Sequence, residues 1–355
     1  MMTGTPTPTR TTQEPVQVHR LRPEDEGRWD AFVQTCPEAT FFHRAGWQRV
    51  MERGLGHRTH FFYAEQDGAI TGVYPLAEVK SWLFGYGLVS LPFCAYGGIA
   101  AITDEAHRAL DAMGMALADE LQVDHLEVRG LKRSHPDWPC KDLYVTFRKA
   151  ISGDEDSDLK AIPRKQRAVV RKAIELGLNA EIDAELPRFL SAYETSVRNL
   201  GTPIFPRRYF EELKREFGDD CECLVVSHEG KTVAAVMSFY FRDEVLPYYG
   251  GGGDSARELK GNDFLYWALM RHAGIKGVRL FDYGRSKQET GAYHFKKNWG
   301  FTPTPLYYEY YLVRAKAVPD VNPLNPKYRL FIAAWKQLPL WLARRLGPLV
   351  SRYLG

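Results

Sequence analysis

A short run near residue 280 gathers side chains that can recognise a substrate or accept a proton. In Phe281-Asp-Tyr-Gly-Arg285 polar and aromatic residues alternate as on a β-strand, and Lys287 follows just past the strand end. Basic side chains at such a place suit a carboxylate or a phosphate. The predicted substrate-binding residues are Tyr283, Arg285 and Lys287. Asp282 can accept a proton, although an ion pair with Arg285 or Arg279 explains this carboxylate equally well.

A run of four glycines at residues 250–253 follows a predicted strand at 245–249. Glycine allows the backbone to turn sharply and to approach a ligand closely, with its amides free to bind that ligand. A merely flexible loop explains the same run equally well. The glycines therefore predict a corner of the backbone, and they leave open whether it binds a ligand.

These candidate residues lie in the second of two halves that share one order of elements. In the first half, periodicity predicts strands at 16–21, 60–65, 70–80, 88–93 and 125–128, and helices at 24–36, 45–55 and 104–121. In the second, it predicts helices at 185–200, 207–217 and 262–273, and strands at 221–227, 233–241, 245–249 and 278–283. Aligning two Tyr-Gly-Gly corners places Gly97 over Gly250. We predict an α/β fold with mixed sheets, used twice, and two unrelated α/β domains are the alternative.

An acidic stretch at 152–158 separates the halves. The predicted divisions are a disordered arm at 1–15, an N-terminal domain at 16–157, a C-terminal domain at 158–318 and a tail at 319–355. A helix starting near Pro163 carries a basic stripe formed by Arg164, Arg167 and Arg171. This stripe is either a solvated face balanced by the acidic stretch, or a contact for a phosphorylated ligand or an RNA.

The charge of the chain is unevenly distributed. The whole sequence has 47 Lys+Arg against 44 Asp+Glu, but residues 321–355 hold six bases and no acid. Those bases are Lys327, Arg329, Lys336, Arg344, Arg345 and Arg352. The rest of the chain therefore has 41 bases against 44 acids, and this acidic balance argues against DNA binding. Hydrophobic residues at 45% and charged residues at 26% exclude disordered, collagen-like and polytopic membrane classes.

The basic tail also carries large apolar residues. They are Leu330, Phe331, Trp335, Leu338, Trp341, Leu342, Leu346, Leu349 and Leu354. Pro339 and Pro348 divide the tail into short helical pieces. A basic amphipathic helix with tryptophan suits an anionic membrane surface. Alternatively, the apolar face packs on the C-terminal domain and only the bases are exposed.

No segment predicts export or membrane insertion. The first 15 residues are rich in Thr and Pro and lack the apolar core of a signal peptide, and no apolar run reaches the ~18 residues of a membrane span. The five cysteines are odd in number, and only Cys221 and Cys223 lie close together. We expect reduced thiols, no metal site, and a cytoplasmic protein that is either free or peripheral at the inner face of the membrane.

Several motifs along the chain occur in an order and spacing that is specific when taken together. They are His43-Arg-Ala-Gly-Trp47, Gly72-Val-Tyr-Pro-Leu76, Ser90-Leu-Pro-Phe93 with Tyr96-Gly-Gly98, Ile162-Pro-Arg-Lys-Gln-Arg167, Phe281-Asp-Tyr-Gly-Arg285 and Phe295-Lys-Lys-Asn-Trp-Gly-Phe301. From about Val16 to the C-terminus, the sequence resembles the FemAB-like proteins associated with the exosortase (PEP-CTERM) system.

This resemblance implies two tandem GNAT (GCN5-related N-acyltransferase) domains that transfer an acyl or aminoacyl group to an amine. The implied acceptor is a small-molecule or lipid-linked amine of a cell-envelope or exopolysaccharide precursor. No permanently bound cofactor is implied; the co-substrate is acyl-CoA, an acyl carrier thioester or aminoacyl-tRNA. One alternative is a tRNA-dependent aminoacyl ligase, although the chain lacks the long charged helical arm of many Fem proteins. The other is a non-catalytic binding protein of the exosortase system.

The resemblance to GNAT domains also implies a donor site between the strands before and after the long helix. The donor-binding residues predicted there are Tyr249, Gly250, Gly251, Lys260, Gly261 and Asn262. The usual pyrophosphate-binding pattern is replaced by Glu258-Leu-Lys-Gly-Asn-Asp-Phe264, which lacks its second glycine and adds the repulsive charge of Asp263. Gly261 and the helix amides, aided by Lys260, can still hold a phosphate.

In GNAT domains the helix after the last core strand often ends Tyr-x-x-x-Gly-Phe, with the tyrosine as the acid. Here Lys296 stands four residues before Gly300, and Tyr293 lies three residues earlier on roughly the same helix face. The resemblance implies that either one protonates the leaving group, or that Lys296 binds a donor phosphate. Asp282 is predicted to orient the acceptor amine or accept its proton. The first half has no evident catalytic set and is expected to shape the acceptor groove.

Overall fold

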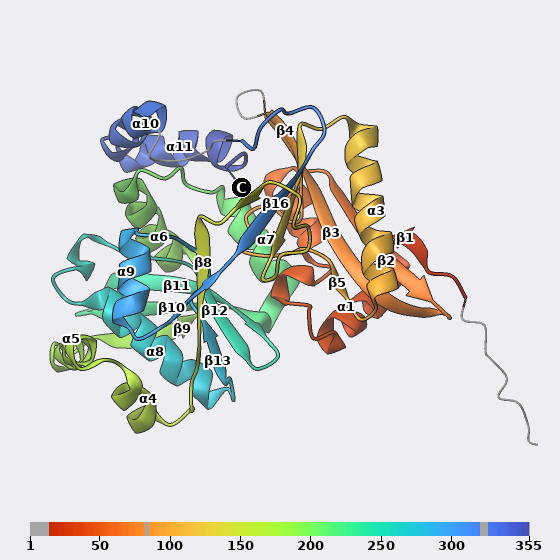
Figure 1. The fold of residues 1–355 in the computed structure, drawn as a ribbon. Helices are drawn as coiled ribbons and strands as arrows, with labels where there is room; N and C mark the ends of the chain where they lie inside the picture. The colour runs from red at the N-terminus through yellow and green to blue at the C-terminus, as the bar shows by residue number, and fades with distance from the viewer. Residues whose placement is uncertain (1–13, 82–84, 320–325, 355) are drawn as a thin grey trace, which may run out of the picture.

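In a computed structural model the chain forms two mixed β-sheets flanked by helices (Figure 1). The structure describes residues 14–81, 85–319 and 326–354. The mixed α/β fold predicted from the sequence is confirmed. Most of the arm predicted at 1–15 lies outside the described residues.

The first sheet is built mainly from the first half of the chain. Its strand order is β1 (Gln17–Arg20), β2 (Thr59–Gln66), β3 (Ala69–Ser81), β4 (Gly85–Val89), β6 (His125–Gly130), β16 (Tyr307–Leu312) and β7 (Cys140–Lys141), and β5 (Ala100–Ala101) pairs with β3. Only β4 and β6 are parallel, because the helix α3 (Asp104–Leu121) connects them. Leu110 of α3 packs with Leu88 and Leu126 of the sheet in one apolar core.

The second sheet repeats this arrangement. Its strand order is β9 (Asn179–Asp183), β10 (Cys221–His228), β11 (Lys231–Phe241), β12 (Glu244–Gly252), β13 (Leu280–Asp282), β8 (Tyr144–Ala150) and β14 (Ser286–Lys287), and β15 (Pro303–Pro305) pairs with β8. Again one parallel pair, β12 and β13, is connected by a long helix, α8 (Gly261–Ile275). The two halves therefore share one topology, as the sequence predicted.

The two halves exchange a strand. Strand β8 lies before residue 157 but pairs with β13 of the second sheet, and β16 lies near the end of the chain but pairs with β6 of the first. The sheets therefore do not follow the predicted division between residues 157 and 158. Each half depends on the other for the strand next to its parallel pair.

The two Tyr-Gly-Gly corners are not equivalent, so the alignment of Gly97 with Gly250 is wrong. Gly97 lies in the loop after β4, whereas Gly250 lies within β12 opposite Val236. A Cβ atom on Gly250 would lie 3.0 Å from Cγ2 of Val236, and one on Gly251 would collide with Ser196. These glycines form a strand against close neighbours, so neither a sharp turn nor a flexible loop explains them.

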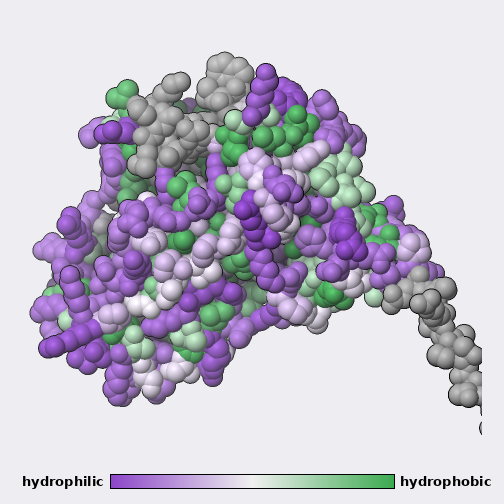
Figure 2. Space-filling view, in the orientation of Figure 1, coloured by the Kyte–Doolittle hydropathy of each residue, from purple (hydrophilic) through white to green (hydrophobic). Residues whose placement is uncertain are grey.

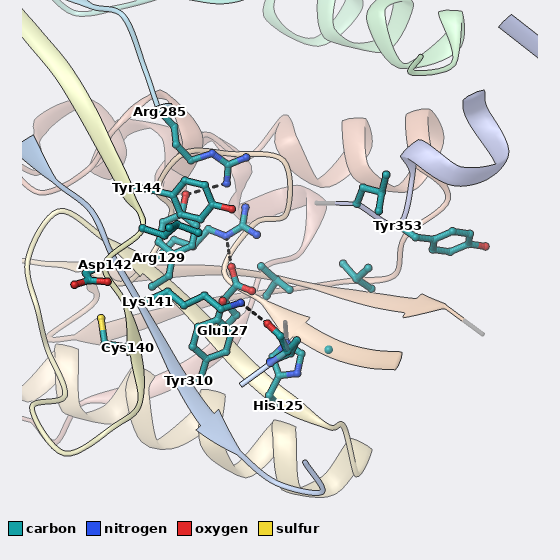
Figure 3. A pocket seen from close by; sticks show the side chains of 17 residues that line it. His125, Glu127, Arg129, Cys140, Lys141, Asp142, Tyr144, Arg285, Tyr310 and Tyr353 are labelled. Atoms are coloured by element: carbon teal, nitrogen blue, oxygen red, sulfur yellow. Dashed lines mark hydrogen bonds and ion pairs between the residues drawn. The ribbon is translucent and has the colours of Figure 1, made fainter. Parts of the chain in front are cut away.

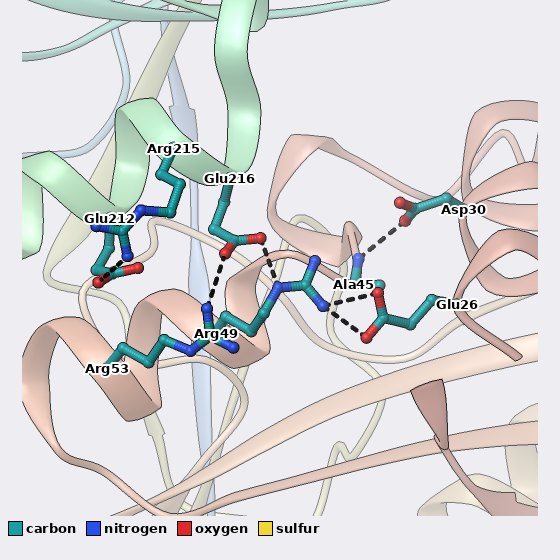
Figure 4. Close-up of polar contacts among 8 residues, drawn as sticks. All are labelled: Glu26, Asp30, Ala45, Arg49, Arg53, Glu212, Arg215 and Glu216. Carbon is teal, nitrogen blue, oxygen red and sulfur yellow. Dashed lines mark hydrogen bonds and ion pairs between the residues drawn. The ribbon is translucent and has the colours of Figure 1, made fainter. Parts of the chain in front are cut away.

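Helices of both halves pack into one shared core. They are α1 (Glu26–Thr35), α2 (Trp47–Arg49) and the π-helical turn η3 (Val50–Leu55) from the first half, with α6 (Leu186–Leu200) and α7 (Arg207–Phe217) from the second. The ring of Phe41 stacks on Phe239 at 4.5 Å and meets Phe217 at 4.6 Å. At the edge of this core, Arg49 donates to Glu26 on α1 and to Glu216 on α7, each at 2.6 Å (Figure 4).

The remaining helices include α4 (Glu155–Ala161), α5 (Arg164–Glu175) and α9 (Gly291–Asn298), beside the short 3₁₀ turns η1 (Pro23–Asp25), η2 (Phe41–His43), η4 (Gly218–Asp220) and η5 (Asp254–Ala256). The tail forms α10 (Pro326–Lys336) and α11 (Leu340–Ser351), which pack against α6. Arg344 donates to Glu194 of α6 at 2.6 Å. Within the described residues, no helix is long and apolar enough to cross a membrane.

Candidate active site

The parallel strands β12 and β13 separate soon after they begin. They pair only at Glu244 with Leu280 and at Val245 with Phe281. Beyond that point β12 continues along β11 alone, with a bulge at Tyr248, because Ser238 faces Pro247 and Met237 faces Tyr249. A bulged residue is left out of the hydrogen-bond ladder, and this residue lies where the strands diverge.

A cavity of about 400 Å³ opens where the strands diverge. Among its lining residues are five predicted from the sequence, namely Tyr249, Gly250, Tyr283, Arg285 and Lys296. The hydroxyl of Tyr283 is buried and has no hydrogen-bond partner among the described residues. A hydroxyl without a protein partner in a cavity wall is available to bond a ligand or water. We call this space the donor cavity.

Lys296 of α9 points its ammonium group at the turn that follows β13. Its Nζ donates to the carbonyl oxygens of Tyr283 at 2.7 Å, Gly284 at 2.9 Å and Arg285 at 3.3 Å. Burial lowers the pKa of Lys296 to about 7, although the nearby carboxylate of Asp282 opposes this shift. The side chain therefore both holds the turn and can release a proton near neutral pH.

Arg285 lies between the two halves of the molecule. Its Nη1 donates to the hydroxyl of Tyr308 at 3.2 Å, and its guanidinium lies 4.7 Å from the ring centre of Tyr144. Among the described residues, no carboxylate lies within ion-pair distance of Arg285. The side chain is surrounded by protein yet open to solvent, because it lines two cavities. An arginine without an acid partner in such a position is available to an anionic ligand.

The second cavity, of about 360 Å³, lies against the first sheet and is shown in Figure 3. Strand β6 directs His125, Glu127 and Arg129 into it, and β16 contributes Tyr308 and Tyr310. The sequence analysis found no evident catalytic set in the first half, and it did not identify these polar residues. The alternation of polar and apolar residues in His-Leu-Glu-Val-Arg was the available signal, since it predicts a strand with one polar face.

The polar wall of this cavity is organised by an ion pair. Arg129 Nε donates to Glu127 at 2.7 Å, and Nη1 of the same arginine donates to the carbonyl of Cys94 at 2.9 Å. Arg129 holds the pKa of Glu127 below its usual value against the effect of burial. Burial lowers the pKa of His125. The wall thus presents an ionised acid, an arginine and a neutral imidazole.

Asp282 does not line either cavity. Its side chain has no exposed surface and accepts hydrogen bonds from Tyr96, from Thr146 at 2.8 Å and from the amide of Gly284 at 2.7 Å. Its arginine neighbour is Arg148, at 3.4 Å, and neither of the two arginines suggested by the sequence. The hydrogen bonds of Asp282 therefore connect the two halves of the molecule. Its buried position does not support direct contact with an acceptor amine.

Glu244 shares this buried site. Both of its carboxylate oxygens accept from Arg148 Nη2 at 3.0 Å. Burial and the adjacent charge of Asp282 raise the pKa of Glu244 to about 8. Two buried carboxyl groups thus share one partly exposed arginine between the sheets, and the sequence prediction did not include Glu244.

Two further predicted residues lie apart from the donor cavity. Tyr293 packs its ring against Phe147, with 5.5 Å between ring centres, and Lys297 Nζ lies 5.2 Å from the ring centre of Tyr293. Lys287 belongs to β14 and pairs with Tyr144 of β8. Neither residue is part of the cavity wall, so of the two predicted acids only Lys296 reaches it.

The start of α8 carries the remaining predicted donor residues. Lys260 adopts a left-handed conformation as the N-cap, and no side chain caps the helix. Gly261 is required by packing, because a Cβ there would lie 2.5 Å from Cγ1 of Val233. Asp263 accepts from Trp299 Nε1 at 3.0 Å and from Gln166, so its carboxylate is already bound by neutral donors. Backbone amides at a helix start can hold a phosphate, but Lys260, Gly261 and Asn262 are not in the wall of the donor cavity.

A comparison with known protein families assigns a known domain to the region that carries the donor cavity. Residues 160–297 match the family model described as an acetyltransferase (GNAT) domain, a range that includes Arg285 and Lys296. The prediction of a GNAT-superfamily acyltransferase is confirmed, and enzymes of this superfamily use acyl-CoA as a co-substrate. No curated protein matches the sequence.

Solved structures extend the likeness to both halves. FemX has a TM-score of 0.65 at 15% identity, over 89% of this chain and 100% of its own. The C-terminal domain of a putative lysylphosphatidylglycerol synthetase from Agrobacterium fabrum has a TM-score of 0.56 at 12% identity, over 81% and 91%. A tandem GNAT protein from the clavulanic acid biosynthesis pathway has a TM-score of 0.53 at 13% identity, over 85% and 100%. At these identities the likeness shows the fold, which is that of tandem GNAT domains.

Proposed function

We propose that the protein is an N-acyltransferase in which the donor occupies the donor cavity and the acceptor amine arrives through the cavity on the first sheet. The observation that carries this proposal is the position of Arg285, which lines both cavities without an acid partner among the described residues. A transfer reaction needs two substrates to meet, and Arg285 marks where the two spaces adjoin.

The chemistry follows from the groups around the donor cavity. A neutral amine attacks the donor carbonyl, the new carbon–nitrogen bond forms, and the carbon–sulfur bond of a thioester or the carbon–oxygen bond of an ester breaks. The bulge at Tyr248 leaves a backbone N–H outside the ladder, where it can polarise the carbonyl. Lys296 supplies a proton to the leaving thiol or hydroxyl, and the proton of the amine passes to water.

An acyl-CoA is the donor we favour. The uncapped start of α8 offers amides to a pyrophosphate, and Asp263 is engaged by Trp299 and Gln166. An acyl carrier thioester presents the same reacting group. Aminoacyl-tRNA is the second candidate, supported by the structural likeness to FemX and to a lysylphosphatidylglycerol synthetase domain.

The acceptor we propose is an amine of a cell-envelope, exopolysaccharide or lipid-linked precursor, encountered at the inner face of the membrane. The motif resemblance to FemAB-like proteins associated with exosortase supports this assignment. The ionised wall of Glu127 and Arg129 suits a polar, charged acceptor better than an apolar one. A non-catalytic binding role in the exosortase system is the alternative that the test below separates.

The test combines the purified protein with labelled acyl-CoA, acyl carrier or aminoacyl-tRNA and an extract of envelope precursors. We expect label in an amide product from one donor class. Replacing Arg285 by Met should lower kcat/KM about 10- to 100-fold, the effect of losing a hydrogen bond to a charged group. Arg279→Met is the matched control, because Arg279 is exposed and, among the described residues, its side chain bonds the carbonyl of Val278 alone. Equal losses in both variants, or binding of substrates without transfer, would contradict the proposal.

A further inference from the structure

Helix α11 has two opposite faces. Toward the body, the small residues Ala343, Gly347 and Ser351 are buried, and a Cβ on Gly347 would meet the backbone of Ile204. On the opposite face Trp341, Arg345 and Leu349 recur every four residues, and Trp341 and Leu349 are each 66% exposed. Packing on the body therefore uses only one side of this helix.

Helix α10 adds to the exposed apolar surface. Leu330 is 78% exposed and Phe331 is 39% exposed. In the space-filling view most of the visible face is hydrophilic, with small apolar patches between the polar side chains (Figure 2). Of the eleven large hydrophobic residues that are exposed in the described chain, six belong to residues 330–354. Single exposed apolar residues are ordinary, but this concentration is typical of an interaction surface.

Among the described residues, three cations of these two helices have no acidic partner. Arg329, Lys336 and Arg345 are exposed, and no carboxylate of the described residues lies within ion-pair distance of them. Arg344 differs, since it is bound to Glu194. We call the exposed apolar residues and these three cations the outer tail surface. Its charge complements an anionic partner, and its tryptophan and leucines suit a partner with an apolar interior.

The outer tail surface lies next to both cavities. Ser351 and Leu354 line the donor cavity, while Tyr353 and Leu354 line the cavity on the first sheet. Leu354, an exposed residue of the outer tail surface, lines both cavities, so a partner bound at Leu354 lies at their rim.

We infer that the outer tail surface binds an anionic lipid bilayer and that the acceptor amine is carried by a lipid of that bilayer. The binding rests on the exposed residues of α10 and α11 alone. The identity of the acceptor rests also on the proposed function, because only an acyltransferase would need an acceptor delivered beside its cavities.

The first experiment measures co-sedimentation of the full chain with vesicles of phosphatidylcholine, with and without phosphatidylglycerol. We expect binding only to the anionic vesicles and a decrease with added salt. Arg345→Gln should lower the partition coefficient about fivefold, the effect of one cation near an anionic surface. Trp341→Glu combined with Leu349→Glu should abolish binding. Ile275→Glu is the matched control, because Ile275 is 81% exposed on α8, away from the tail.

Three results would overturn the inference. They are no binding to anionic vesicles, equal loss of binding in the Ile275 control, and a wild-type dimer that Trp341→Glu converts to a monomer. The last result would show that a second copy of the chain covers the surface. Circular dichroism of each variant checks that the fold is retained.

A second experiment tests the lipid acceptor independently of the proposed transfer activity. The protein is given labelled donor with vesicles of envelope lipid extract or with the water-soluble fraction of the same envelope. We expect label in the lipid phase, and loss of that label in the Trp341→Glu and Leu349→Glu variant. Label only in the water-soluble fraction would overturn the lipid acceptor while supporting the proposed function. Absence of label from both fractions, with vesicle binding intact, would count against the proposed function and leave the membrane contact standing.

Discussion

Tyr96 and Asp282 join the two halves of the molecule by a hydrogen bond from a phenol to a buried carboxylate. Tyr96 comes from the loop after β4 of the first sheet, and Asp282 ends β13 of the second. Asp282 in turn accepts the amide of Gly284, at the start of the turn that Lys296 holds. The geometry of the donor cavity therefore depends on a contact between residues far apart in the chain.

Removing this hydroxyl should destabilise the protein measurably. In Tyr96→Phe the carboxylate of Asp282 loses one donor in a site without solvent, and we expect a loss of about 2 kcal/mol in the free energy of unfolding. Urea denaturation followed by circular dichroism measures this change. Tyr311→Phe is the control, because its hydroxyl bonds Asp119 at 3.2 Å on the surface and should contribute less than about 1 kcal/mol. Equal effects of the two substitutions would show that the Tyr96 contact has no special importance.

Elements with strong local signals were predictable from the sequence. Helices α3 and α7 have the residue bounds expected from it, and in α3 the side chain of Thr103 caps the amide of Ala106. The exchange of β8 and β16 was not predictable in this way. The partners of these strands lie in the other half, and a strand's own residues do not specify a distant partner.

Only part of the candidate site could be predicted, because local sequence signals place some of its residues and not others. Arg285 and Lys296 line the donor cavity. Their positions could be predicted because the strand before Arg285 and the helix that carries Lys296 have clear sequence signals. Tyr293 and Asp282 share those elements but face the interior, and spacing alone does not show which side of a short helix meets a cavity. Glu127 and Arg129 were missed because residues 125–128 were predicted as a strand without use of their alternating polar side chains.

Glu244 should make stability depend on pH. Its pKa is raised to about 8 in the folded protein, mainly by burial and by Asp282, above the ordinary carboxyl value of 4.5. The folded chain then holds a proton that the unfolded chain has lost, so stability falls as pH rises from about 4.5 to about 8. Replacing Glu244 by Gln keeps the side chain neutral and should remove this dependence.

Urea denaturation across this pH range measures the difference between wild type and Glu244→Gln. Glu222→Gln is the control, because the pKa of Glu222 is lowered to about 2, chiefly by His272 and Lys276 against the effect of burial. The titration of this carboxylate itself is complete above about pH 4.5, so it adds no pH dependence of its own over the range. If the difference in unfolding free energy between the wild type and Glu244→Gln did not change with pH, Glu244 would be ionised over the whole range.

Arg49 should contribute more to stability than the neighbouring Arg53. Arg49 donates to Glu26 and Glu216 at 2.6 Å and so connects α1 with α7, whereas Arg53 lies 3.8 Å from Glu216 and is half exposed. We expect Arg49→Met to cost about 2 kcal/mol and Arg53→Met less than about 1 kcal/mol. Thermal and urea denaturation of both variants test this order, and a larger loss for Arg53→Met would contradict it.

Lys296 should determine the pH above which kcat declines, that is, the alkaline limb of the pH–rate profile. Burial lowers its pKa to about 7, so the ammonium form that can protonate a leaving group declines above that pH. Lys296→Met should lower kcat at least about 100-fold and leave a residual activity without the alkaline limb. Lys297→Met is the control, because Lys297 is exposed beside Tyr293 and should change neither the rate nor the pH profile. If Lys296→Met instead kept kcat and its alkaline limb while unfolding at lower urea, the lysine would serve only to hold the carbonyls of Tyr283, Gly284 and Arg285.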